Sequence, residues 1–265
     1  MTLSTVARGI AVAGAAFVLL ATTFHAAAAG EKLVGTYGEE RALLRFKVSD
    51  ATVQKLLPEG WQVSPDTAGP SKDANLNVAF VDVFTAQSPD GKPEDPYRVA
   101  AVVIPAKKKG TEATVPLVVT GFASIPSYVP GPYEAFALAS ATVDRHVHTD
   151  PGGTSNIEEA WEFKGDGGDL VQLQLQYVRG PLTRSKIETT PHSGIKPEFY
   201  RIYRIEQAAD IVRSTPTGTD HAQKFLFKAA GGKLSQIFDG SEQLISITSL
   251  PFYSRQVFLP EPMTQ

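Results

Sequence analysis

Short apolar runs separated by clusters of glycine, proline, serine and aspartate recur along most of the chain. The clearest run spans residues 170–177, where apolar side chains alternate with glutamines: Val171, Leu173, Leu175 and Tyr177 against Gln172, Gln174 and Gln176. A period of two places the apolar side chains on one face of a half-buried strand. Turn clusters at 88–93 and 164–169 separate neighbouring runs. This pattern excludes a helical bundle and predicts a mainly β protein.

The remaining runs predict ten or more strands and at most two or three short helices. The expected strands are 41–48, 76–84, 97–104, 115–122, 135–143, 160–163, 170–177, 199–205, 225–229, 244–248 and 252–259. A short helix is expected to begin after Ser49, a typical N-cap residue. A closed or nearly closed antiparallel barrel is the economical architecture because closure removes exposed strand edges.

Composition and motifs exclude several functional classes. Cysteine is absent, which rules out disulfides, thiolate nucleophiles, zinc fingers and iron–sulfur clusters. The formal net charge is −3 and no basic stripe occurs, so nucleic acid is not an expected partner. The chain has no Gly-x-Ser-x-Gly motif, no phosphate-binding loop and no dinucleotide fingerprint, so we expect no cofactor.

Residues 1–29 have the layout of a secretory signal peptide. Arg8 is the only charged residue before Glu31, an apolar run follows it, and small residues precede a cleavage point after Ala28 or Ala29. The apolar run is shorter than the about 20 residues that a membrane-spanning helix needs, although an uncleaved anchor is the alternative. The sequence therefore predicts a mature domain of residues 30–265, periplasmic or secreted, without stable membrane insertion after cleavage.

Several landmarks occur in an order that resembles the acetoacetate decarboxylase superfamily. A strand and short helix lead into Leu-Leu-Pro-Glu-Gly-Trp at 56–61, a long hairpin covers 76–104, a Pro- and aromatic-rich stretch covers 194–203, and Leu-Pro at 250–251 lies within a terminal hairpin. The resemblance covers roughly residues 35–260. It implies a β-barrel or double-sheet fold with a central cavity. It also implies a chemistry in which a lysine amine forms a Schiff base with a ketone and a carboxylate leaves as carbon dioxide.

The chain departs from the family's lysine motif, which reads Gly-Arg-Glu followed by Pro-Lys-Lys. By order along the chain the motif falls at 130–136, which contains no lysine, or at 159–164. The resemblance leaves Lys164 or Lys196 as the amine, Glu159 or Glu134 as the acid–base group, and Arg41 as the carboxylate partner. An isolated lysine has a pKa of about 10.4 and needs burial or a neighbouring cation to become nucleophilic. We therefore expect no efficient decarboxylation of acetoacetate.

For the exported decarboxylase-like protein itself, the expected ligand or substrate is a small oxo acid or another apolar carbonyl compound in the barrel cavity. Two other functional classes remain open. The first alternative is a non-catalytic, small-ligand-binding barrel that has the same cavity but no reactive amine. The second is a metal-dependent hydrolase built on His146 and His148, which lie two residues apart on one strand face. Tyr128, Tyr133 and Phe136 form either a structural corner or the mouth of the cavity. In each case the expected partner is a small molecule, and a homo-oligomer is left open.

Overall fold

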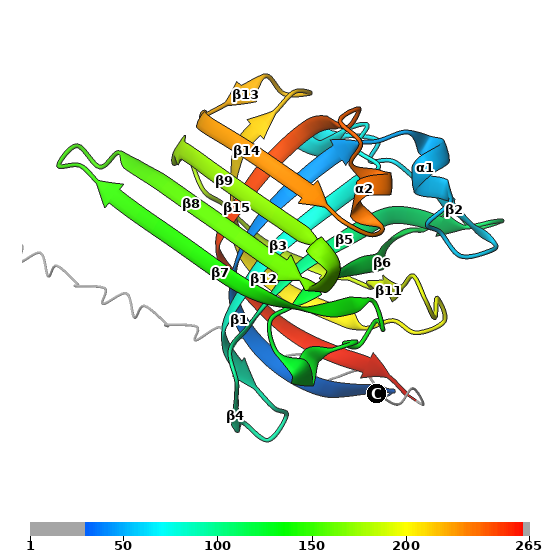
Figure 1. Ribbon diagram of the computed structural model, residues 1–265. Helices are drawn as coiled ribbons and strands as arrows, with labels where there is room; N and C mark the ends of the chain where they lie inside the picture. Colours follow the sequence, from blue (N-terminus) through cyan, green and yellow to red (C-terminus); the bar gives the residue numbers. More distant parts are fainter. Residues whose placement is uncertain (1–29, 262–265) are drawn as a thin grey trace, which may run out of the picture.

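The computed structural model describes residues 30–261 and is mainly β, as predicted (Figure 1). Fifteen strands belong to one sheet. Their bounds are β1 Glu31–Lys47, β2 Trp61–Val63, β3 Leu76–Gln87, β4 Pro93–Glu94, β5 Tyr97–Lys108, β6 Thr114–Ala123, β7 Phe136–Thr149, β8 Ser155–Gly165, β9 Leu170–Val178, β10 Thr183–Thr189, β11 His192–Ser193, β12 Ile202–Ser214, β13 Thr219–Asp220, β14 Ala222–Ala230 and β15 Gln243–Pro260.

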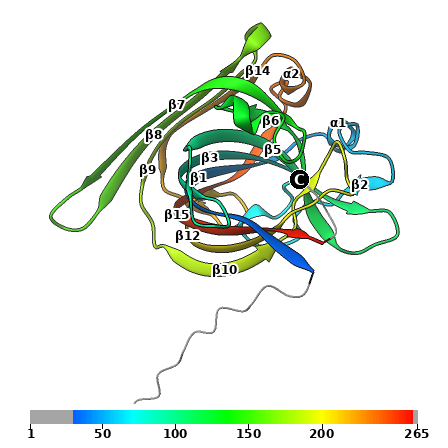
Figure 2. The same ribbon diagram turned by 90° about the horizontal axis from the view of Figure 1, so that it is seen from below.

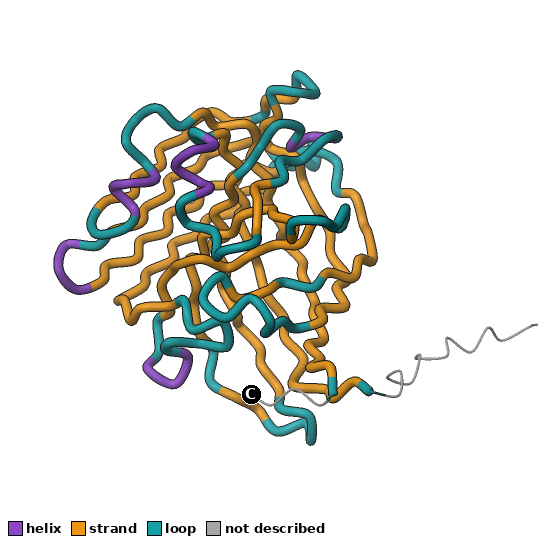
Figure 3. Tube along the Cα trace, turned by 90° about the vertical axis from the view of Figure 1, so that its right-hand side faces the viewer, coloured by secondary structure: helices purple, strands orange, loops and turns teal. Residues whose placement is uncertain are grey.

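Helical structure is confined to short segments at the periphery (Figure 3). The α-helices are α1 (Asp50–Gln54) and α2 (Leu234–Ile237), and the 3₁₀ turns are Gly69–Ser71, Pro126–Tyr128 and Asp166–Gly168. Within the described range, no helix is long and apolar enough to cross a membrane. The predicted signal peptide, residues 1–29, lies outside the described residues.

The sheet runs in the order β10-β12-β15-β1-β3-β5-β6-β7-β8-β9-β14. Most neighbours are antiparallel, but β6 pairs in parallel with both β7 and β11, so the sheet is mixed and not purely antiparallel as expected. The strands from β10 to β6 curl around a central space (Figure 2). The ladder does not close. However, β11 follows β10 after two residues and pairs with β6, so this stretch of chain bridges the two ends of the curl.

The strands β7, β8, β9 and β14 fold back as a second layer over one face of the curled sheet. Phe80 of β3 packs against Trp161 and Phe163 of β8, with ring centroids 5.8 and 6.2 Å apart. Residues of β1, β3, β5, β8 and β9 share one buried apolar cluster between the layers. This cluster is the main core of the protein, because it buries the largest aromatic side chains.

The opposite face of the curled sheet turns inward. On β1, Ala42, Leu44 and Phe46 enter the core between the layers, whereas Arg41 and Arg45 point the other way. The same alternation divides β3 and β5. The period of two in these strands therefore separates a packing face from a cavity-lining face.

Several predicted strand boundaries are wrong: β7, β8 and β12 extend beyond the expected ranges, and β1 and β15 differ for a reason that can be seen in the sequence. The first strand begins at Glu31 instead of residue 41, because glycines at 35 and 38 interrupt the apolar pattern without ending the pairing. The strands expected at 244–248 and 252–259 are one continuous strand, β15. The sequence Leu250-Pro251 lies at an irregularity in the pairing of β1 with β15, which is a position where a sheet tolerates proline.

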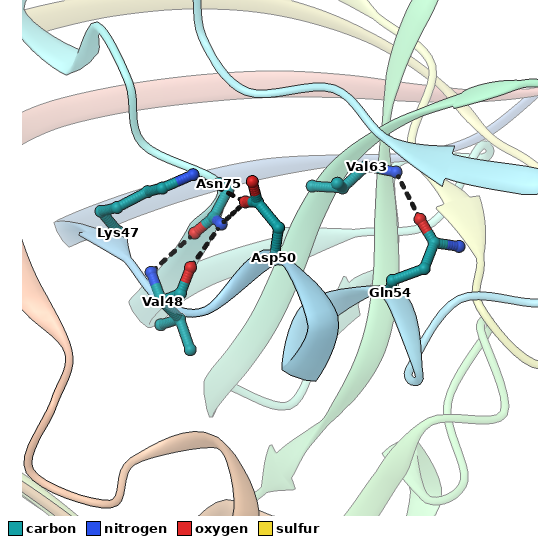
Figure 4. A network of polar contacts seen from close by, with 6 residues as sticks. All are labelled: Lys47, Val48, Asp50, Gln54, Val63 and Asn75. Atoms are coloured by element: carbon teal, nitrogen blue, oxygen red, sulfur yellow. Dashed lines mark hydrogen bonds and ion pairs between the residues drawn. The ribbon is translucent and has the colours of Figure 1, made fainter.

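A buried amide fixes the chain where β1 ends and α1 begins (Figure 4). Asn75 accepts a hydrogen bond from the Val48 backbone N–H at 2.8 Å and donates to the Val48 carbonyl at 2.7 Å and to Asp50 Oδ1 at 2.6 Å. Ser49 occupies the N-cap position of α1, as expected, but its side chain makes no capping hydrogen bond. The side chain of Asn75, and not that of Ser49, therefore fixes the start of α1.

Candidate functional site

The curled sheet encloses a cavity of about 290 Å³. Its walls are mostly aliphatic, from the inward face of β1, β3, β5 and β6, and include Leu43, Val81, Val99, Ala101 and Val118. A volume of this size is at the lower end of the range for small-molecule sites. The cavity-lining face is therefore built to enclose a compact, largely apolar molecule.

A cluster of ion-paired groups lies at one end of this apolar cavity. Glu39 is fully buried and lies between two arginines: Arg41 Nε donates to Glu39 Oε2 at 2.7 Å, and Arg255 Nη2 lies 2.5 Å from Glu39 Oε1. Burial alone would raise the pKa of Glu39, but Arg255 and Arg41 overcome it and hold the pKa below its usual value. Glu39 therefore stays ionised and both arginines stay charged.

Aromatic rings hold the two guanidinium groups in place. Arg41 lies over the ring of Tyr253 at 3.8 Å, and Arg255 lies over Tyr37 and Tyr203 at 4.8 and 4.5 Å. Such stacking stabilises a cation in a partly desolvated position. The arginines are thus fixed on both sides, by a carboxylate and by ring faces.

Five tyrosines line the cavity: Tyr97, Tyr128, Tyr133, Tyr203 and Tyr253. The hydroxyls of Tyr133 and Tyr203 are hydrogen-bonded to each other, and Tyr97 stacks on Tyr128 with centroids 4.3 Å apart. Burial, with a contribution from Tyr203, raises the pKa of Tyr133 well above its usual range. The Tyr133 hydroxyl therefore stays protonated at neutral pH. Tyrosine hydroxyls can donate hydrogen bonds to an anion or a carbonyl oxygen.

The cavity carries an excess of positive charge. Arg45 is a third lining arginine, so the cavity has three guanidinium groups, of which Arg41 and Arg255 share the one carboxylate of Glu39. Two positive charges therefore remain for a ligand to neutralise. A group able to do so is a carboxylate or a comparable oxyanion, for which arginine has matching geometry.

Comparison with known proteins identifies the architecture. No family model matches the chain, and no curated protein matches it in sequence. Solved structures do match it. The enduracididine biosynthesis enzyme MppR, complexed with pyruvate, has a TM-score of 0.54 at 12% identity, over 94% of this chain and 96% of that one.

An acetoacetate decarboxylase-like enzyme from Sphingomonas wittichii RW1 has a TM-score of 0.52 at 12% identity, over 86% of this chain and 91% of that one. Acetoacetate decarboxylase from Legionella pneumophila has a TM-score of 0.50 at 12% identity, over 88% and 86%. The chain has the acetoacetate decarboxylase-like fold. At these identities the likeness establishes the fold and leaves the chemistry to be argued from the site.

The two candidate amines of this fold lie at the surface. Lys164 ends β8 and pairs with Glu162 at 2.5 Å, with 60% of its side chain exposed. Lys196 pairs with Glu134 at 2.5 Å and is 65% exposed. The structure thus brings Lys196 and Glu134 together, but outside the cavity.

The other twelve lysines also lie outside the cavity. All fourteen lysines of the chain fall within residues 30–261, and none of them is buried or lines the cavity. The segment 130–136, where the family's lysine falls by order, instead places Tyr133 and Phe136 in the cavity wall. Tyr128, Tyr133 and Phe136 thus line the cavity.

The remaining predicted site residues, Arg41 and Glu159, share a smaller pocket of about 40 Å³ beside the main cavity. Arg41 lines both spaces. Glu159 is buried between the two layers, accepts a hydrogen bond from Trp161 Nε1 at 3.0 Å and lies 3.2 Å from the Tyr177 hydroxyl. Glu159 therefore does not line the cavity, and Arg41 is the predicted residue that does.

The histidine pair offers no metal centre. His146 and His148 lie on β7, both exposed, opposite Glu158 and Asn156 of β8. Among residues 30–261, no group of three or more histidine, aspartate or glutamate side chains is arranged to hold a metal ion.

Sequence reasoning missed Glu39, Arg45 and Arg255. Glu39, Arg41 and Arg45 fall at positions of equal parity, so the period of two would have placed them on one face of a longer first strand. Arg255 joins them only through the pairing of β15 with β1, which no local pattern reveals.

Proposed function

We propose that this protein binds a small organic anion with an apolar body in its barrel cavity, and that it does not form a Schiff base with it. The observation that supports this most directly is the composition of the cavity wall: three arginines and five tyrosines among aliphatic side chains, with no lysine. Of the interpretations that the sequence left open, this corresponds to the non-catalytic binding barrel.

The geometry supports a defined binding mode at the Glu39 end. The carboxylate of the ligand would meet Arg41 and Arg255, whose combined charge exceeds that of Glu39 by one unit. Tyrosine hydroxyls would donate further hydrogen bonds, and the apolar body would contact the wall around Val81 and Val99. Fixed donors in a largely apolar cavity are the usual basis of orientation in small-molecule sites.

Proteins of similar fold hold comparable ligands. MppR is seen complexed with pyruvate, a carboxylate, and with HEPES, a sulfonate. Schiff-base catalysis has less support here, because an amine must reach the ketone and lose its proton. Lys164 and Lys196 do not reach into the cavity, since both are exposed and ion-paired outside it.

Calorimetric titration with octanoate tests the proposal. Octanoate is expected to bind, and Arg41→Met to weaken binding by about tenfold or more, the loss expected for one charge-assisted hydrogen bond. Arg184→Met is the matched control, because Arg184 is an exposed arginine of β10 paired with Glu206. Absence of octanoate binding, or an equal effect of both variants, would contradict the proposal.

A trapping experiment addresses the Schiff base separately. The protein is incubated with acetoacetate and borohydride and then weighed, while release of carbon dioxide is followed in parallel. We expect no mass adduct and a rate near background. An adduct that maps to one lysine, with turnover that disappears when that lysine is changed to alanine, would restore the decarboxylase interpretation and identify the nucleophile.

A further inference from the structure

Arg45 is the cavity arginine that no carboxylate pairs with. It lies four residues after Arg41 on β1 and faces the same cavity. Its Nη1 donates to the Thr248 hydroxyl at 3.0 Å. Among the described residues no carboxylate oxygen lies within 4.0 Å of it, and Asp66 is the one acidic group whose field acts on it from farther away. Its situation differs from that of Arg41 and Arg255, which share Glu39.

Two buried polar atoms without a partner belong to the residues that flank Arg45 on the neighbouring strands. Asn77 lies opposite Arg45 on β3 and lines the cavity, and Ser246 lies opposite Arg45 on β15 and is fully buried. Asn77 Oδ1 and Ser246 Oγ are buried without a hydrogen-bond partner in the described part of the chain. Buried polar atoms are normally paired, so two unpaired ones beside an unpaired cation indicate a ligand position.

The chemistry of these groups selects an anion. A guanidinium donates hydrogen bonds only, a hydroxyl can donate one, and a carboxamide can turn its NH₂ toward the cavity. An oxyanion placed there would accept from Arg45 and Asn77 together. Thr248 already accepts from Arg45 and holds it in position.

We infer that Arg45 and Asn77 form a second anion subsite, and that the ligand of this cavity carries an acidic group at each end of an apolar chain. This inference rests on the proposed function, because it assigns the first acidic group to Arg41 and Arg255. Four residues of extended strand separate Arg41 from Arg45, which corresponds to about 13 Å. Between the two ends the wall is apolar and includes Leu43, which precludes a polyhydroxylated linker.

The discrimination expected from this arrangement is opposite to that of a simple apolar cavity. In a cavity with one charged end, octanoate binds more tightly than suberate, because the second carboxylate of suberate is desolvated without a partner. With a guanidinium at the far end, that carboxylate gains a charge-assisted pair. Suberate should then bind about ten- to a hundredfold more tightly than octanoate.

Calorimetric titration of the full chain with octanoate and suberate, at fixed ionic strength, is the test. Arg45→Met is expected to reverse the order, and Asn77→Ala to weaken the binding of suberate more than that of octanoate. Arg184→Met, which removes an exposed arginine of β10, should change neither ligand. Across succinate, adipate, suberate and sebacate, affinity should peak inside the series, because the two subsites are a fixed distance apart.

Each outcome decides the matter. A higher affinity for suberate that Arg45→Met reverses supports the second subsite. Octanoate binding as tightly as suberate in the unchanged protein overturns the second subsite alone and leaves the proposed function standing. Failure of both ligands to bind overturns both. If Arg45→Met does not fold, the ratio in the unchanged protein and the Asn77→Ala variant still give the answer.

Discussion

Replacing Glu39 by glutamine tests the electrostatics of the site most directly. The substitution keeps the shape of the side chain and removes the one charge that two buried arginines share. Breaking a buried ion pair by removing one partner costs about 3–5 kcal/mol, because the other charge stays buried without compensation. With a urea dependence of roughly 2 kcal/mol per M, the unfolding midpoint should fall by about 1.5–2.5 M.

The neighbouring residue supplies the control. Glu40 pairs with Arg145, and its side chain is 31% exposed, whereas that of Glu39 is fully buried. Glu40→Gln should therefore change the free energy of unfolding by no more than about 1 kcal/mol. Urea titrations followed by circular dichroism measure both variants. Equal and small effects would show that water or relaxation compensates the arginines, which would refute the description of a dry, charged cavity.

The pH dependence provides an independent check. Because Arg255 and Arg41 lower the pKa of Glu39 in the folded protein, its contribution to stability is present above the unfolded pKa of about 4.3 and is lost as the pH falls through the folded pKa. The difference between the unchanged protein and Glu39→Gln should therefore be largest above about pH 5 and shrink in acid. Octanoate should stabilise Glu39→Gln more than the unchanged protein, because the ligand replaces the missing negative charge.

Three further outcomes are expected. Asn75→Ala should lower the free energy of unfolding by about 2–4 kcal/mol in urea titrations. The reason is that it removes three hydrogen bonds and leaves the Val48 backbone groups buried and unpaired. A loss below about 0.5 kcal/mol would contradict the role of Asn75 in fixing this segment. Gly121→Ala should cost about 1–3 kcal/mol in the same assay, because its Cβ would meet the Ala100 carbonyl oxygen at 2.3 Å, and a neutral effect would refute the close approach. N-terminal sequencing of the exported protein should return a start near Gly30, and an intact initiator methionine would contradict the signal peptide.

The fold was accessible from the sequence wherever strands obey a simple period. Residues 170–177 alternate cleanly and form β9, whose Leu173 and Leu175 are fully buried in the core. The extended first strand was not accessible, since glycines at 35 and 38 and the run Glu39-Glu40 obscure the period. The parallel pairing of β6 with β7 could not be predicted either, because local patterns do not specify which strands become neighbours.

The site was accessible only in part, for a related reason. Arg41 was found through its place in the order of landmarks, and the aromatic segment near Tyr133 was recognised as a possible wall. Arg255, which shares Glu39 with Arg41, lies more than two hundred residues away in the sequence, and this shared contact depends on an irregular register between β1 and β15. Such a site exists only once the sheet is assembled.

The same architecture explains how this fold can persist without the lysine that defines the chemistry of acetoacetate decarboxylase. Along β1, β3 and β5 the residues that fill the core alternate with those that line the cavity. Substitutions on the cavity face therefore leave the packing between the two layers intact, and the fold does not constrain the reaction. In this chain Tyr133 and Phe136 lie in the cavity wall, and arginines lie at both ends of the cavity. A cavity with fixed cations, tyrosine hydroxyls and an apolar wall has the groups needed to hold and orient an anion.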